Sequence, residues 1–156
     1  MKKTSFTFAV TLASLSIAIS PSIAEKNPAM SYAIWADGEF ETDELSQPEI
    51  SGKFADPDGD GLNNLMEYAL DGDPTYPDRV EVEPSARISG RLLVMDFKID
   101  TSKSDVTVEP LSSTDLKTWR TVESELISTR GTIQKRRVSM PTKSASGFLK
   151  IRVTSN

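Results

Sequence analysis

The chain has 156 residues, a formal net charge of −5 at pH 7, and neither histidine nor cysteine. It therefore lacks the side chains needed for His-based acid–base catalysis, catalytic triads, thiol catalysis, disulfide bonds and His- or Cys-ligated zinc.

The first 24 residues have the features of a signal peptide. Lysines stand at positions 2 and 3, an apolar stretch covers residues 6–19, and Ser22-Ile23-Ala24 is a small-x-small cleavage site. A membrane anchor is the alternative, but the apolar stretch is shorter than the roughly 20 residues that a bilayer span needs. We expect cleavage after Ala24, a secreted or cell-surface protein, and no membrane span in the mature chain.

A short helix is predicted over Pro28–Ala36. Asn27 is a typical N-cap before a proline at the first helical position, and Asp37-Gly38 is a typical stop. Trp35 would then pack on the helical core. An exposed position for stacking on a sugar is the alternative for this tryptophan.

Residues 56–67 have the spacing of a calcium-binding EF-hand loop, with carboxylates at positions 1, 3 and 5, glycine at 6 and glutamate at 12. Ca²⁺ takes about six to eight oxygen ligands, including a backbone carbonyl at position 7 and often a water at position 9. The predicted ligands are Asp56, Asp58, Asp60, the carbonyl of Leu62, Asn64 and Glu67. The alternative is an acidic turn that only caps the following helix.

The loop leads into an amphipathic helix. Its apolar residues recur at helical spacing, at Leu62, Leu65, Met66, Ala69 and Leu70. Asp71-Gly72 offers a left-handed C-terminal cap, and Pro74 ends the helix. Residues 46–52 contain a proline and a glycine where an ordinary EF-hand has its entering helix. We therefore expect a loop followed by one helix rather than a hand with two.

Residues 75–89 are predicted to be mainly loop, with Val80 and Val82 as a short edge strand. Asp71, Asp73 and Asp78 are candidates for a second, weak cation site. Aspartates in a turn rich in glycine and proline need no ion to explain them, however.

After residue 90 the pattern changes to the period of two that is typical of strands. Strands are predicted at Leu93–Ile99, from Val106, at Trp119–Val122, at Ile133–Met140 and at Leu149–Val153. Five or six short antiparallel strands at this spacing indicate a small β-sandwich of the immunoglobulin or fibronectin type III kind. The predicted fold class is α+β, with an EF-hand-like helical region at residues 25–78 packed on a β-sandwich at residues 79–156.

Charge changes sign near the same boundary. Residues 37–83 contain 15 acidic and two basic residues, and residues 84–156 contain seven acidic and 13 basic residues. An acidic half docked on a basic half and two simply solvated surfaces are equally compatible with this distribution. Lys135-Arg136-Arg137 is a weak indication of polyanion binding and is more typical of an exposed strand face. We predict no nucleic-acid partner.

Residues 56–70, followed by Gly72-Asp73-Pro74, resemble the thrombospondin type 3-like or dockerin-like calcium repeat of bacterial secreted proteins. In many of those proteins a small β-domain follows, with segments similar to Val106–Glu109, Ser113–Leu116 and Trp119 of this chain. The resemblance extends from about Trp35 to the C-terminus. It implies an extracellular structural or attachment module, frequently joined to larger enzymes or adhesins. A dockerin carries two such loops to bind its cohesin partner, whereas this sequence shows one.

Three classes of function are compatible with these features. In a calcium-stabilised attachment module, Ca²⁺ is the cofactor and the β-sandwich contacts an extracellular protein or glycan. A hydrolase such as a glycosidase would need only Asp and Glu, but the densest carboxylates belong to the calcium loop. A calcium sensor would need a partner helix to swing open. We expect the first class, with no catalytic residues and a calcium affinity of about 10⁻⁴–10⁻³ M.

Overall fold

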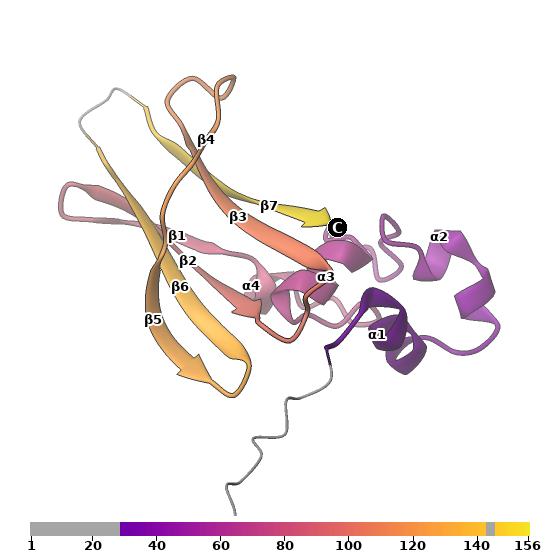
Figure 1. Cartoon of the computed structure of the whole chain (residues 1–156). Helices are drawn as coiled ribbons and strands as arrows, with labels where there is room; N and C mark the ends of the chain where they lie inside the picture. The colour runs from indigo at the N-terminus through magenta and orange to yellow at the C-terminus, as the bar shows by residue number, and fades with distance from the viewer. Residues whose placement is uncertain (1–28, 143–145) are drawn as a thin grey trace, which may run out of the picture.

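Two antiparallel sheets and a group of short helices make up the structure, a computed structural model that describes residues 29–142 and 146–156. The helices gather at one end of the sheets, and the C-terminus lies beside them (Figure 1). The coarse prediction of a β-rich α+β chain, with its helices ahead of its strands, is confirmed. The predicted signal peptide, its cleavage site after Ala24 and the predicted cap at Asn27 lie outside the described residues.

The helical elements are all short. They are α1 (Tyr32–Glu39), a 3₁₀ turn (Glu44–Ser46), α2 (Pro48–Ser51), α3 (Asn64–Leu70) and α4 (Arg79–Val82). Helix α1 begins at Tyr32 rather than at Pro28, because the hydroxyl of Ser31 accepts the N–H of Ile34 and caps it there. Helix α2 is a single turn, so the loop has no long entering helix, as Pro48 and Gly52 predicted.

Helix α3 starts inside the predicted calcium loop. Asn63 is its N-cap, with a side-chain oxygen that accepts the N–H of Met66 at 3.0 Å. Asp71 ends the helix in the left-handed conformation, with φ at 68°, at the predicted position. The loop and this helix are therefore one continuous unit.

Residues 80–82 belong to helix α4 and not to the predicted edge strand. The N–H groups of Val82 and Glu83 donate to the carbonyls of Asp78 and Arg79, at 3.3 and 2.8 Å. Val82 is buried, whereas Val80 is 89% exposed. Two valines separated by one residue are typical of a strand face, but one helical turn places them on different sides.

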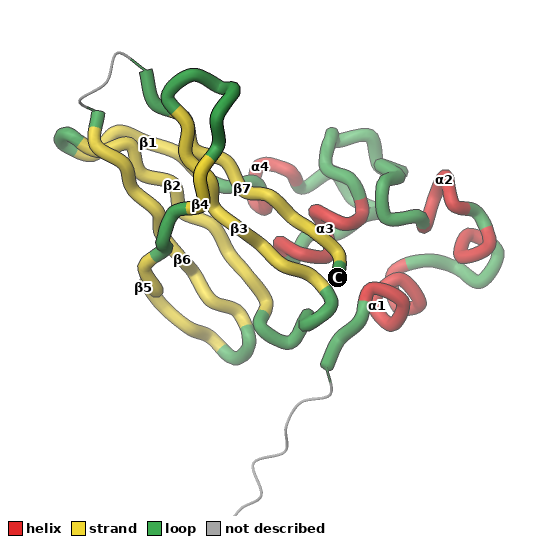
Figure 2. Tube along the Cα trace, turned by 45° about the horizontal axis from the view of Figure 1, so that its top comes forward, coloured by secondary structure: helices red, strands yellow, loops and turns green. Residues whose placement is uncertain are grey.

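Within the described residues, seven strands form two sheets in which every pairing is antiparallel (Figures 1 and 2). The four-stranded sheet has the order β1 (Ser85–Ser89), β2 (Leu92–Asp100), β6 (Ile133–Pro141), β5 (Glu125–Arg130). The three-stranded sheet has the order β4 (Arg120–Thr121), β3 (Val106–Ser113), β7 (Phe148–Ser155).

The predicted strands correspond to β2, β3, β4, β6 and β7, with β4 shorter than expected. Strand β1 lies in a segment predicted to be loop, and β5 was not predicted. Every residue of both strands is exposed, so neither strand has the alternation of buried and exposed side chains from which a strand can be predicted. Each is formed by pairing with an inner strand, across turns at Gly90 and Gly131 that have φ at 60°.

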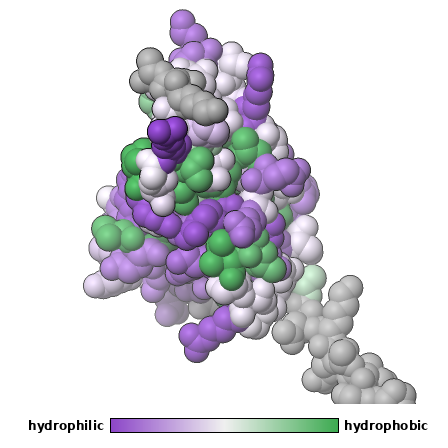
Figure 3. Space-filling model, turned by 90° about the vertical axis from the view of Figure 1, so that its left-hand side faces the viewer, coloured by the Kyte–Doolittle hydropathy of each residue, from purple (hydrophilic) through white to green (hydrophobic). Residues whose placement is uncertain are grey.

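The two sheets pack face to face through a cluster of buried side chains. Met95, Phe97 and Val138 of the four-stranded sheet form its centre, and Leu149 and Ile151 of β7 pack against them. On the side of the molecule where the four-stranded sheet lies, apolar side chains form separate groups among polar ones (Figure 3). No helix in the described ranges has the length and apolarity needed to cross a membrane.

The helices pack on the same end of both sheets. Trp35, Phe40 and Tyr68 are buried together with Leu65, and Val106 and Val153 of the three-stranded sheet pack against this cluster. Trp35 is 8% exposed, which supports the packing interpretation over a role as an exposed sugar platform. Helix α3 thus connects the predicted calcium loop to the sheets.

Candidate metal centre

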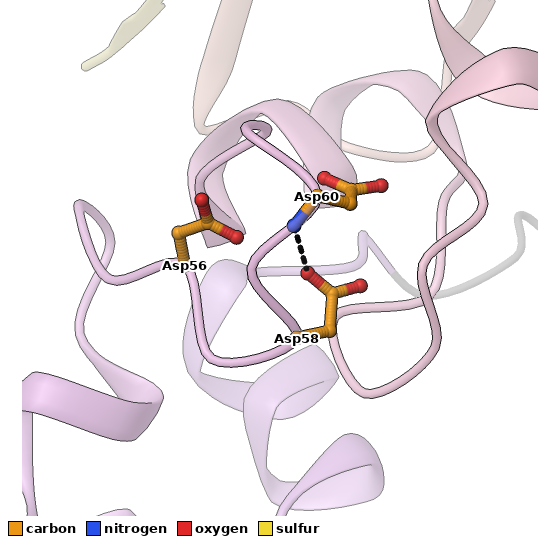
Figure 4. A group of neighbouring side chains, drawn as sticks. All are labelled: Asp56, Asp58 and Asp60. Carbon is orange, nitrogen blue, oxygen red and sulfur yellow. Dashed lines mark hydrogen bonds between the residues drawn. The ribbon is translucent and has the colours of Figure 1, made fainter.

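The predicted loop folds so that three carboxylates converge. Oxygens of Asp56, Asp58 and Asp60 lie within 4.8 Å of one another, around one turn of the chain (Figure 4). Two oxygens bound to one Ca²⁺ at about 2.4 Å are separated by no more than about 4.8 Å, and the three aspartates satisfy this limit. Gly59 and Gly61 make this turn possible, with φ at 75° and 94°.

Backbone N–H groups hold the three aspartates in place. Asp56 accepts from Gly59 and Gly61, both at 3.0 Å. Asp58 accepts the N–H of Asp60 at 3.1 Å, and Asp60 accepts the N–H of Leu62 at 2.8 Å. The second oxygen of Asp58, Oδ2, is buried and has no hydrogen-bond partner. The loop is thus ordered by its own backbone and still has a free carboxylate oxygen.

Glu67 is a buried carboxylate without hydrogen-bond partners among the described residues. It lies in the first turn of α3, is 1% exposed, and neither carboxylate oxygen has a hydrogen-bond partner. Its carboxylate rests against the backbone of Gly72, where a Cβ would overlap Oε2. Burial, together with repulsion from Asp78 and Asp60, raises the pKa of Glu67 to about 8. A buried carboxylate without partners is costly, and a bound cation is one way to compensate it.

A second group of carboxylates overlaps the first. Oxygens of Asp60, Glu67 and Asp78 lie within 4.8 Å of one another, so Asp60 belongs to both groups. Oδ1 of Asp78 is buried and unpartnered, like Oδ2 of Asp58. Burial also raises the pKa of the Asp58 and Asp78 carboxyls above their usual values. Four buried oxygens without partners therefore belong to Asp58, Glu67 and Asp78.

The other two predicted ligands are Asn64 and the carbonyl of Leu62, and the side chains of both residues also hold the loop in place. The amide nitrogen of Asn64 donates to the carbonyls of Ile50 and Gly52, at 2.7 and 2.9 Å, which ties the loop to α2. The oxygen Oδ1 of Asn64 has no hydrogen-bond partner. The side chain of Leu62 is buried with Leu70 and so anchors the loop on α3.

The sequence indicated Asp78 only as part of a second, weak cation site with Asp71 and Asp73. Among the described residues, Asp71 and Asp73 are in neither carboxylate group. Oδ1 of Asp71 lies 3.5 Å from Nζ of Lys103, and Oδ1 of Asp73 accepts the N–H of Thr75 at 2.9 Å. The spacing of the loop motif could not indicate Asp78, because this residue reaches the site through the turn that follows α3.

Arg79 is the basic residue that contacts this region. Its N–H donates to Oδ2 of Asp60 at 2.8 Å, and its guanidinium donates to the Asp60 carbonyl at 3.3 Å. The guanidinium also pairs with Glu83 at 3.1 Å. Among the ion pairs of the described residues, none includes Glu67 or Asp78. Within residues 29–142 and 146–156, no cationic side chain therefore forms an ion pair with these two carboxylates.

Comparisons with protein-family models, with curated proteins and with solved structures gave no match to this chain. The chemistry of the site therefore has to be argued from its donor atoms. These are carboxylate and backbone oxygens, which suit hard cations such as Ca²⁺ and Mg²⁺ and not the softer transition metals. Ca²⁺ tolerates irregular geometry and several carboxylates, whereas Mg²⁺ needs near-octahedral geometry and keeps most of its waters.

Proposed function

We propose that this chain is a secreted calcium-binding structural and attachment module. Ca²⁺ is bound by the loop of residues 56–67, with the carboxylates of Asp56, Asp58, Asp60 and Glu67 as its main ligands. The ion fixes the loop and α3 at the end of the two sheets. The sheets, proposed to be of the immunoglobulin or fibronectin type III kind, contact an extracellular protein or glycan.

The single observation that supports this most strongly is the buried, unpartnered carboxylate of Glu67. Position 12 of the loop motif predicts a glutamate that binds calcium through both oxygens. Both oxygens of Glu67 are buried beside other carboxylates, and no donor among the described residues is hydrogen-bonded to either. An acidic turn that only caps a helix would leave its carboxylates exposed or hydrogen-bonded, so this arrangement favours a ligand.

The proposed role of the ion is to stabilise the fold. A ligand that binds only the folded state stabilises it by RT ln(1 + [L]/Kd). With a Kd of about 10⁻⁴–10⁻³ M, about 10 mM Ca²⁺ would add about 1.4–2.7 kcal/mol. That corresponds to a rise in the midpoint of thermal unfolding of about 5–10 °C for a domain of this size.

The test is thermal unfolding of residues 25–156 in about 10 mM Ca²⁺ and in chelator. In the native chain, calcium should raise the midpoint by about 5–10 °C. In Glu67→Gln the calcium effect should be largely lost, while stability in chelator should equal or exceed that of the native chain, because glutamine avoids the free energy needed to bury or protonate the Glu67 carboxylate. Glu49→Gln, at an exposed residue of α2, is the matched control and should respond to calcium like the native chain. An equal midpoint of thermal unfolding in calcium and in chelator for the native chain would rule out the proposal.

A further inference from the structure

Asp78 lies outside the loop of residues 56–67, yet one of its oxygens is directed into the same group of carboxylates. We propose that Asp78 is a ligand of the cation bound by Asp60 and Glu67. We also propose that the cation thereby fastens helix α4 to the end of the two sheets. This inference rests on the proposed function, because it needs a cation at the site.

One oxygen of the Asp78 carboxylate is hydrogen-bonded, and the other is available to a ligand. Its Oδ2 accepts the N–H of Asp73 at 3.2 Å, which orients the carboxylate, while Oδ1 is buried without a partner. Oxygens of Asp78, Asp60 and Glu67 lie within 4.8 Å of one another. Asp78 is also the residue before α4, where an aspartate commonly caps the helix, but its side chain makes no such bond. The Asp78 carboxylate therefore belongs to the carboxylate group with Asp60 and Glu67 and does not cap α4.

The independent indication of a ligand is the buried carboxylate that Asp78 faces. Glu67 is 1% exposed and has no hydrogen-bond partner on either oxygen. Among the described residues no cationic side chain is paired with Glu67 or Asp78, so the two neighbouring carboxylates repel each other when ionised, and a cation bound between them would replace that repulsion with attraction. Arg79 is adjacent in sequence, but its guanidinium is occupied by the Asp60 carbonyl and by Glu83.

Ligation by Asp78 would connect the ion to the sheets through α4. The N–H of Val82 in α4 donates to the carbonyl of Asp78 at 3.3 Å. The side chain of Val82 is buried with Leu62 and Leu70, and Val108 of β3 and Ile151 of β7 pack against this cluster. Fixing Asp78 therefore fixes the start of α4, and with it the valine that covers the end of the space between the sheets.

The first experiment measures calcium affinity by isothermal titration calorimetry on residues 25–156. Asp78→Asn should bind calcium about tenfold or more weakly, because affinity in such sites follows the number of charged ligands. The asparagine keeps an oxygen for the N–H of Asp73. Glu81→Gln removes the same charge from an exposed residue of α4 and should leave the affinity unchanged.

The second experiment measures local opening of α4 by the rate of trypsin cleavage. Arg79 is an exposed trypsin site at the start of this helix. In the native chain, cleavage after Arg79 should be at least about tenfold slower in excess calcium than in chelator, because cleavage requires local opening. In Asp78→Asn, calcium at a concentration that saturates the variant should give little protection. Equal protection of the variant and the native chain would overturn the proposed link to α4.

A measurement on the native chain keeps the inference testable if Asp78→Asn does not fold. Calcium should shift the ¹³C resonance of the Asp78 carboxylate as it shifts those of Asp58 and Glu67. An unshifted Asp78 resonance, or an Asp78→Asn variant with native affinity while Asp58→Asn loses binding, overturns this inference alone. A native chain that binds no calcium overturns the proposed function as well.

Discussion

The carboxylate of Glu67 lies against Gly72, and this contact explains why glycine stands there. A Cβ at position 72 would overlap the glutamate oxygen and come within 3.1 Å of the side chain of Val82. The sequence predicted a left-handed cap at Asp71-Gly72, and Asp71 is the left-handed residue of this pair. Gly72 is therefore required by the space that the Glu67 side chain occupies.

We expect Gly72→Ala to destabilise the protein by about 1–3 kcal/mol, as overpacking does, and to weaken calcium binding by displacing Glu67. Urea unfolding in calcium and in chelator measures the first effect, and calorimetric titration measures the second. Gly38→Ala is the control: this glycine lies in α1, and a Cβ added there would have no neighbouring atom within 4 Å. It should stabilise the protein by about 0.5–1 kcal/mol. A Gly72→Ala variant as stable as the native chain, with native affinity, would contradict the role of this contact.

At the scale of single residues, the sequence predicted the part of the site that is local. The spacing of Asp56, Asp58 and Asp60 is a short-range pattern, and the structure does bring their oxygens together. Asp78 could not be assigned in this way, because its distance from the loop depends on the turn after α3. The amide of Asn64 was equally unpredictable, since its partners are carbonyls of α2 and the residue after it, which lie earlier in the chain.

At the scale of elements, strands with a buried face were predictable and exposed ones were not. Strand β2 was predictable because Met95 and Phe97, two residues apart, are buried in the core between the sheets, although Val94 and Asp96 on its other face are buried too. Strands β1 and β5 have no buried residue, and their formation depends on pairing with a neighbouring strand. Helix α4 was predicted as a strand because two valines in a short segment do not distinguish the two periods.

Asp96 of β2 joins three strands of one sheet. Its carboxylate accepts from Arg137 of β6 at 2.6 and 2.9 Å and from Arg87 of β1 at 2.9 Å, and it is 7% exposed. The hydrogen bonds and charge of these arginines lower the pKa of Asp96 to about 2, despite the opposing effect of burial. Sequence could not pair these residues, because the register of β1, β2 and β6 brings them together.

A lowered pKa means that the ionised carboxylate stabilises the fold at higher pH. This contribution is complete above about pH 5 and is lost as pH falls toward 2, through the folded-state pKa. We expect Asp96→Asn to lower the free energy of unfolding by about 1–2 kcal/mol at pH 6, a value reduced because both arginines are partly solvated. The difference from the native chain should shrink as pH approaches 2.

Urea unfolding from pH 2 to 7 measures this difference. Glu109→Gln, which removes a more exposed ion pair with Arg152, is the control and should cost less than about 1 kcal/mol at pH 6. A cost for Asp96→Asn that stays constant over the whole pH range would show that its charge is not the stabilising element.

At the scale of the whole molecule, the helical region and the sheets share one interface. The hydroxyl of Tyr68 donates to Asp105 at 2.7 Å and lies 2.9 Å from the carbonyl oxygen of Met30. The other oxygen of Asp105 accepts the N–H of Tyr32 at 2.8 Å. These bonds join α1, α3 and the turn before β3 beside a buried aromatic cluster, so neither region is packed without the other.

The two tryptophans are reporters for the two regions. Trp35 is buried among the helices, and Trp119 lies near the three-stranded sheet with Nζ of Lys150 at 4.0 Å from the centroid of its ring. We expect Trp35→Phe and Trp119→Phe variants to unfold in urea with fluorescence midpoints that coincide with their own circular dichroism midpoints, because the shared interface makes unfolding cooperative. Chelation should lower both midpoints together. Two separated transitions in either variant would show that the regions unfold independently.

The proposed cation site lies within one continuous segment, since every group proposed to contact the ion lies between Asp56 and Asp78. In evolutionary terms this makes the segment a transferable unit with a signature longer than the loop motif. A homologous segment would retain the glutamate, a glycine five residues after it and an aspartate six residues after that glycine. The intervening residues could diverge freely as long as the turn keeps its length. Insertions between this glycine and aspartate would remove the outer ligand while leaving the loop motif intact.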